Sequence, residues 1–211
     1  MDTRNPLLLT VRALVSVIDG ADALTRGHSM RIARYAVRVA QQMGVPESDW
    51  EAIELGALLH DLGRIAVLRD VVSRPGTLDS GERALVQAHA AIGWEMIREI
   101  PGMEAAAEIV YSHHEQPDGK GYPRALPADR IPIGARIVMV CAAYDAMTEE
   151  RPYRRGLPRE VVIDELRSHA GTQFFSDVVE AFVQLVENAQ LWDGFPILER
   201  ERYLQGFRTA A

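Results

Sequence analysis

Apolar residues recur along most of the chain at the three- and four-residue spacing of one helix face. In residues 6–18 this face consists of Leu7, Leu8, Val11, Leu14, Val15 and Ile18. Further helices are predicted at about residues 25–43, 47–61, 79–101, 103–115, 132–149, 158–169, 176–189 and 197–207, with a short piece near 67–72. Because no alternating run is long enough for a sheet, the pattern predicts an all-α fold, a single-domain helical bundle.

Turn residues divide the chain into these helices. Gly44 follows the second helix, and Pro101 ends the helix that Asp79 or its neighbour begins. The segment from 116 to about 131 is rich in Gly, Pro and Asp, and loops longer than about 12 residues in a compact domain are often functional. We assign residues 1–190 to one domain and 191–211 to a C-terminal amphipathic helical extension, which either packs on the first helix or docks a partner.

Composition and charge narrow the function classes. The 211 residues are 47% hydrophobic and 25% charged, and the net charge of −7 argues against binding duplex nucleic acid through a basic surface. The single cysteine, Cys141, excludes an internal disulfide framework and favours a cytoplasmic location. The apolar start contains Arg12 and follows Asp2, unlike a signal peptide or a membrane span, so no membrane association is expected.

Five of the six histidines fall on the apolar faces of four predicted helices: His28, His60, His89, His113 and His114. A buried imidazole needs partners for its donor and its acceptor, so each could be a hydrogen-bonded core residue. Together with the carboxylate of Asp61, next to His60, they also form the ordinary ligand set for zinc, iron, manganese or nickel. The sixth, His169, lies near a predicted helix end and is expected to be capping or solvated.

The segment after these histidines has an unusual composition. Asp118-Gly119-Lys120-Gly121-Tyr122-Pro123 places several residues that control backbone direction directly after His113-His114-Glu115. Alone, this segment would be an ordinary surface turn. Beside a histidine cluster, it predicts a shaped loop at the mouth of a metal site.

The ordered set of motifs resembles a known family. His60-Asp61, continued as Leu62-Gly63, is similar to the signature of the HD superfamily of metal-dependent phosphohydrolases. The His113-His114-Glu115 segment with its Gly121-Tyr122-Pro123 loop resembles the defining motif of the HD-GYP branch. Further matches, which extend the resemblance over about Val15 to Glu187, are Gly27-His28-Ser29, Arg74-Pro75-Gly76, His89, Arg151-Pro152-Tyr153-Arg154 and Gly171-Thr172-Gln173-Phe174.

The resemblance implies a helical domain that hydrolyses a cyclic dinucleotide, chiefly cyclic di-GMP, to the linear dinucleotide and often on to GMP. It implies a centre of two or three divalent cations, iron or manganese, with zinc or nickel as alternatives, and a water between two of them that attacks phosphorus. The implied ligands are His28, His60, Asp61, His89, His113 and His114, with Asp61 bridging the metals. Asp61 and Arg64 are the implied catalytic residues, and Lys120, Tyr122, Arg151 and Arg154 the implied substrate contacts.

Three positions depart from the family pattern. Arg64 stands where a lysine is usual, which keeps the charge but provides no proton donor. Ala142 replaces a usual aspartate ligand, and Asp145, one helical turn later, either substitutes for it or makes a structural hydrogen bond. Leu24 replaces a carboxylate that accompanies a third metal. We therefore expect at most two metals, with the site of His28, His60 and Asp61 weakened.

Three functions follow as alternatives. The first is a cyclic-dinucleotide phosphodiesterase. The second, favoured by Ala142, is a degenerate module that binds nucleotide or a signalling partner without turnover. The third is an HD phosphohydrolase of mononucleotides, which the Gly121-Tyr122-Pro123 loop disfavours. Control is expected to come from a signalling-protein partner or from a homodimer.

Overall fold

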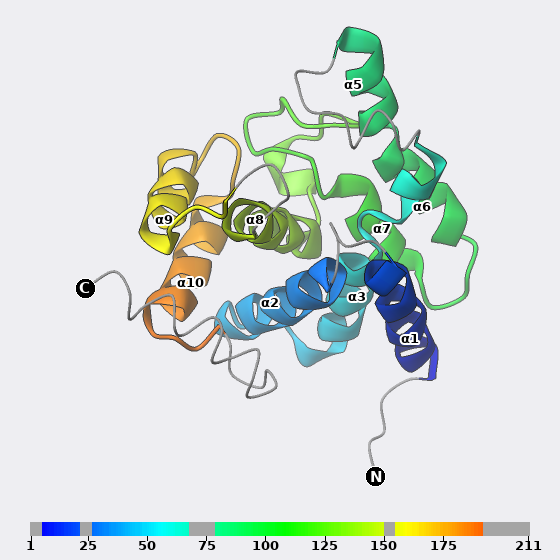
Figure 1. Ribbon diagram of the computed structural model, residues 1–211, viewed down its shortest axis with the longest axis horizontal. Helices are drawn as coiled ribbons and strands as arrows, with labels where there is room; N and C mark the ends of the chain where they lie inside the picture. Colours follow the sequence, from blue (N-terminus) through cyan, green and yellow to red (C-terminus); the bar gives the residue numbers. More distant parts are fainter. Residues whose placement is uncertain (1–5, 22–26, 68–78, 150–154, 192–211) are drawn as a thin grey trace.

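The computed structural model describes residues 6–21, 27–67, 79–149 and 155–191, with side chains of the first range described to residue 15. These residues form an assembly of helices (Figure 1). Apart from an isolated bridge between Ala170 and Phe174, the described ranges contain no β-structure, so the predicted all-α fold is confirmed. The elements are α1 (Pro6–Ala21), α2 (His28–Gln42), α3 (Glu47–Leu59), η1 (Leu62–Ala66), α5 (Ser80–Gln87), α6 (His89–Ile97), α7 (Glu104–Ser112), η2 (Ala128–Arg130), α8 (Ile133–Thr148), α9 (Arg159–Ser168) and α10 (Ser176–Glu187).

The predicted helix at 79–101 is two helices. Its start is as expected, because Asp79 and Glu82 form a reciprocal capping box. The helix breaks at Ala88. There, Nδ1 of the next residue, His89, lies 2.6 Å from the carbonyl oxygen of Val86 and donates a hydrogen bond to it. The predicted piece at 67–72 falls outside the described residues except for Val67, and the predicted helix at 197–207 lies outside them entirely. No helix in the described ranges is long and apolar enough to cross a bilayer.

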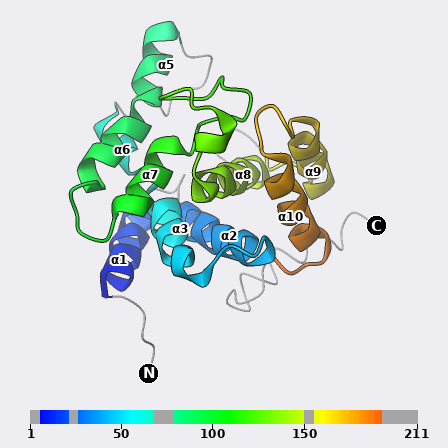
Figure 2. The same ribbon diagram turned by 180° about the vertical axis from the view of Figure 1, so that it is seen from behind.

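Close contacts hold the central helices together, and both views show α2, α3, α7 and α8 at the middle of the molecule (Figures 1 and 2). Ile109 of α7 packs against a glycine on each of two neighbouring helices, Gly56 of α3 and Gly134 of α8. A Cβ at Gly56 or at Gly134 would lie within 2.6 Å of the Ile109 side chain. Buried aromatic rings join α2, α8 and α10, since the ring of Phe182 in α10 lies 6.4 Å from that of Tyr35 in α2 and 4.8 Å from that of Tyr144 in α8.

The connection after α3 places the His60-Asp61 pair against α6. The short helix η1 packs on α6 so closely that a Cβ on Gly63 would overlap the backbone carbonyl of His89 and approach the amide nitrogen of Gly93 at 2.7 Å. Only glycine allows this approach. The tight contact brings Asp61, at the start of η1, beside His89, at the start of α6.

Candidate metal centre

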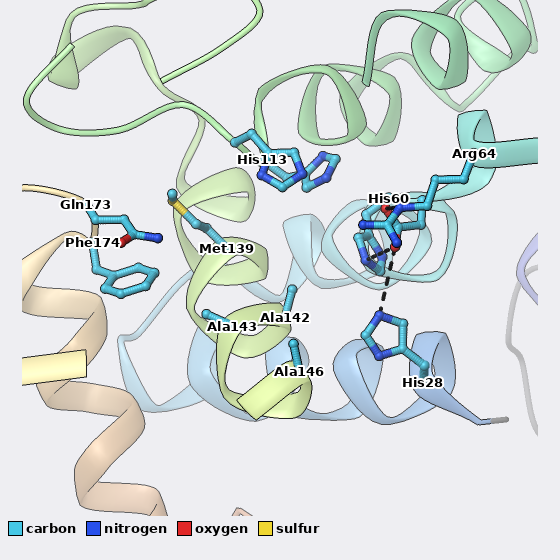
Figure 3. Close-up of a pocket in the computed structure, with 12 residues that line it drawn as sticks. His28, His60, Arg64, His113, Met139, Ala142, Ala143, Ala146, Gln173 and Phe174 are labelled. Atoms are coloured by element: carbon cyan, nitrogen blue, oxygen red, sulfur yellow. Dashed lines mark ion pairs between the residues drawn. The ribbon is translucent and has the colours of Figure 1, made fainter. Parts of the chain in front are cut away.

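The structure brings together all five histidines that the sequence predicts as ligands. They form two groups with Asp61: His28, His60 and Asp61 in one, and His89, His113 and His114 in the other. Within each group the potential ligand atoms lie within 4.8 Å of one another. The residues come from α2, from the ends of α3 and α7, and from the start of α6, and most of them line one pocket (Figure 3).

Asp61 lies between the two groups. Its Oδ2 is 3.4 Å from Nε2 of His60 and 4.0 Å from Nε2 of His28. Its Oδ1 is 3.5 Å from Nε2 of His89, whose Nε2 is in turn 3.3 Å from Nε2 of His113. One carboxylate therefore presents a different oxygen to each histidine group, which is the arrangement a bridging ligand needs.

Backbone carbonyls fix the orientation of three of these histidines. The Nδ1 atoms of His60, His89 and His113 lie 2.8, 2.6 and 2.7 Å from the carbonyl oxygen three residues earlier. In each case this carbonyl lies in the last turn of a helix, where carbonyls are no longer bonded to the N–H group four residues later. A carbonyl only accepts, so Nδ1 carries the proton and the neutral ring keeps its lone pair on Nε2. The local fold thus selects the tautomer that a metal ligand requires.

His28 is held by a side chain instead. Its Nδ1 lies 2.6 Å from Oδ2 of Asp145, which is 2% exposed. Arg31 donates two hydrogen bonds to the same carboxylate, from Nε at 2.6 Å and from Nη2 at 3.0 Å. Asp145 therefore makes structural hydrogen bonds and does not take the place of the missing aspartate as a metal ligand. Ala142, which also lines the pocket, supplies no ligand atom.

Burial controls the protonation of the group around His113. Burial lowers the pKa of His89 and His113, and it lowers that of His114 to about 3, with the neighbouring imidazoles adding to the effect in the last two. Burial also acts to lower the pKa of His60, but the Asp61 carboxylate and the hydrogen bond to the Ala57 carbonyl together outweigh it, and the net shift is upward. Conversely, burial opposes ionisation of Asp61, but His60 and Arg64 hold its pKa well below the ordinary value. Neutral imidazoles beside an ionised carboxylate are the forms that bind a cation.

One atom of the centre lacks a hydrogen bond. Oδ1 of Asp61 is buried and accepts no aligned hydrogen bond from any described residue, although Nε of Arg64 forms an ion pair with it at 2.7 Å. A buried charged oxygen that accepts no aligned hydrogen bond is only partly compensated by one ion pair, and this is costly. A divalent cation between this oxygen and the three histidines of the second group would remove that cost, so these residues fit a metal ion.

The loop after His114 closes over the centre. The Tyr122 ring stacks on His114, with ring centroids 4.5 Å apart, and burial raises the pKa of its hydroxyl. Buried Glu115 holds the loop by accepting hydrogen bonds from the backbone N–H groups of Arg124 and Leu126 at 2.7 and 2.9 Å. The sequence pattern assigns Glu115 no role of its own, although Glu115 belongs to the His113-His114-Glu115 motif.

The other candidate residues have different surroundings. Arg64 lines the pocket, whereas Lys120 has an 81% exposed side chain that pairs with Asp118 at 3.3 Å. Arg151, Arg154 and Leu24 lie outside the described residues. The far wall of the pocket consists of Met139, Ala143, Ala146, Gln173 and Phe174 (Figure 3). Gln173 and Phe174 belong to the Gly171-Thr172-Gln173-Phe174 segment that resembles the family, whereas no sequence motif indicated the other three.

Comparisons with known proteins identify the family of the chain and several relatives. A model of the family described as "HD domain" matches residues 12–178. A cyclic di-GMP phosphodiesterase of Thermotoga maritima is 36% identical over 78% of this chain and 45% of its own length. A 3'3'-cGAMP-specific phosphodiesterase of Vibrio cholerae is 36% identical over 70% of this chain and 32% of its own length. The chain thus spans less than half the length of these relatives.

Solved structures share the fold. The crystal structure of a cyclic GMP-AMP-specific phosphodiesterase of V. cholerae superposes with a TM-score of 0.71 and 20% identity, over 94% of this chain and 53% of that one. A Bdellovibrio bacteriovorus protein described as an HDG"Y"P protein superposes with a TM-score of 0.61 and 19% identity, over 76% of this chain and 51% of that one. At these identities the likeness concerns the fold alone.

Proposed function

The chain belongs to the HD domain family, and from that premise we propose that it is a metal-dependent phosphodiesterase that hydrolyses a cyclic dinucleotide, with cyclic di-GMP the first candidate. The observation that carries the proposal is the position of Asp61, whose two oxygens lie 3.4 Å from His60 and 3.5 Å from His89. The names of the relatives, which are phosphodiesterases of cyclic di-GMP or 3'3'-cGAMP, support the substrate class.

The proposed metal ligands are the two histidine groups and Asp61, with iron or manganese expected and zinc or nickel as alternatives. Divalent cations in such a centre supply hydroxide at neutral pH and neutralise charge on phosphoryl oxygens. The chain itself contributes histidines whose Nδ1–H groups are engaged by backbone carbonyls and whose Nε2 atoms lie beside Asp61 or beside one another. It also contributes a pocket of about 200 Å³ in which a phosphodiester can reach the centre.

Substrate contacts are proposed for Arg64 and Tyr122. The Arg64 guanidinium lies in the pocket wall and can donate two parallel hydrogen bonds to a phosphate, although it cannot deliver a proton to a leaving group. The Tyr122 hydroxyl stays protonated because burial raises its pKa, so it acts as a donor. Lys120, Arg151 and Arg154 stay predictions as further contacts, with Lys120 on the exposed side of the loop.

Ala142 favours a second candidate function. It lines the pocket with a methyl group, and Asp145 is engaged with His28 and Arg31, so the group of His28, His60 and Asp61 has no further carboxylate among the pocket residues described. A weakened metal there would leave a module that binds the nucleotide without hydrolysing it. Restoring the carboxylate with Ala142→Asp distinguishes the two functions.

The deciding experiment uses the chelated chain reloaded with Mn²⁺ or, without oxygen, Fe²⁺. It is incubated with cyclic di-GMP and with 3'3'-cGAMP, and the products are separated by chromatography. We expect metal-dependent formation of the linear dinucleotide, lost in Asp61→Asn and kept in Asp164→Asn, a matched change on the exposed face of α9.

Other results separate the candidates. Binding without turnover, with hydrolysis gained in Ala142→Asp, would favour the degenerate module. If the chain neither binds nor hydrolyses either dinucleotide, both candidate functions are contradicted. A homodimer or a signalling-protein partner stays a prediction, and light scattering on the purified chain would test the homodimer.

A further inference from the structure

His28 differs from the other candidate ligands in what holds it. His60, His89 and His113 donate through Nδ1 to backbone carbonyls, whereas His28 donates to the carboxylate of Asp145 at 2.6 Å. An imidazole that donates to a carboxylate is more electron-rich at its other nitrogen than one that donates to a neutral carbonyl. His28 belongs to the group of His28, His60 and Asp61, which is the group that lacks a carboxylate at position 142.

Asp145 is fixed in this position by its own partners. Its Oδ1 accepts from Nε of Arg31 at 2.6 Å, and its Oδ2 accepts from both Nη2 of Arg31 and Nδ1 of His28. Arg31 also pairs with Glu149 at 3.1 Å. With both oxygens engaged and the side chain buried, the carboxylate cannot turn toward the pocket without breaking these bonds.

We propose that Asp145 is a positioning residue for His28: it sets the tautomer and orientation of the imidazole and supplies, from behind it, negative charge that Ala142 does not supply in the pocket. This inference rests on the proposed metal centre. Nε2 of His28 then points to Oδ2 of Asp61, 4.0 Å away, with its lone pair available. Asp145 itself is not a ligand, so the centre keeps three side-chain ligands in this group.

The proposal makes a prediction specific to one of the two groups. Removing the charge with Asp145→Asn should weaken cation binding by the His28 group about 10- to 100-fold, the usual cost of losing such a partner. The group of His89, His113 and His114 should bind within about twofold of its original affinity, because its orientation depends on backbone carbonyls and burial. That second group is therefore an internal control for folding.

The first readout needs no metal and no variant of Asp145. In the chelated chain, long-range ¹H–¹⁵N spectra distinguish the two neutral tautomers of each histidine, and the His28 signals are identified by their loss in His28→Gln. We expect His28 with its proton on Nδ1. A proton on Nε2 would overturn the proposal.

The second readout is a Mn²⁺ titration followed by the magnetic resonance signal of the free ion. The natural chain, Asp145→Asn and Asp164→Asn are compared, together with their melting temperatures. Selective loss of one binding step in Asp145→Asn supports the proposal. Equal loss of both steps, or loss of neither, would show that Asp145 has only a structural role. If the natural chain binds neither Mn²⁺ nor, without oxygen, Fe²⁺, the proposed function fails, and the tautomer of His28 still decides whether Asp145 positions it.

Discussion

The histidine cluster should make the metal-free protein sensitive to mild acid, and His114 gives the clearest case. Burial lowers its pKa from 6.5 to about 3. Between these values the unfolded chain takes up a proton that the folded chain does not, so the free energy of unfolding falls as the pH falls. At about 1.4 kcal/mol per pKa unit, acidification from pH 7 to pH 5 removes about 2 kcal/mol through this one group.

The His114→Gln variant isolates this contribution. Glutamine keeps a planar polar group against Tyr122 but does not titrate. Urea unfolding of the chelated proteins, measured at pH 7, 6 and 5, should show a loss of stability about 2 kcal/mol smaller in the variant than in the natural chain. His169→Gln, at an exposed histidine outside the cluster, is the matched control and should follow the natural chain. Equal pH dependence in all three proteins would refute the account of the buried, neutral His114.

Three further substitutions test the pocket and its supports. Arg64→Met should lower kcat/KM about 10- to 100-fold through loss of a charge-assisted hydrogen bond. Arg64→Lys keeps the charge and should retain most of the kcat/KM of the natural chain. Equal kcat/KM in the two variants would exclude a phosphate contact. Gly63→Ala should lower the free energy of unfolding by about 2–3 kcal/mol, since its Cβ meets the backbone of α6. The same change at Gly81, where the nearest atom lies at 3.4 Å, should not destabilise, and equal urea midpoints would contradict the packing of η1. Glu115→Gln should lower the free energy of unfolding by about 1–3 kcal/mol and raise KM, because an amide cannot accept both backbone hydrogen bonds. An unchanged melting temperature and an unchanged KM would exclude a role of Glu115 in holding the loop.

Most of the fold could be predicted from local patterns. The spacing of apolar residues and the turn residues give α2, α3, α7, α8, α9 and α10 to within a few residues. The break at Ala88 and the short helix η1 could not be predicted. The first coincides with the bond between His89 and Val86, and the second depends on the contact of Gly63 with α6. Neither interaction leaves a mark in the apolar periodicity.

The histidines of the site were visible because imidazoles at apolar positions of several helices need partners. The roles of Asp145 and Glu115 were not decided by sequence. Asp145 bonds to His28 and Arg31, which precede it by 117 and 114 residues, so its orientation depends on how α2 packs against α8. Glu115 bonds to backbone N–H groups, which no residue type reveals. Long-range pairing of polar groups therefore could not be predicted from the sequence.

The central claim is that imidazoles from four helices hold divalent cations on both sides of Asp61. Crystals of the chain grown with Mn²⁺ and measured at a wavelength where manganese scatters anomalously would test it most directly. We predict density peaks beside Asp61, one among His89, His113 and His114 and a second, of lower occupancy, beside His28 and His60. The account would be contradicted if no peak lay within coordination distance of Asp61.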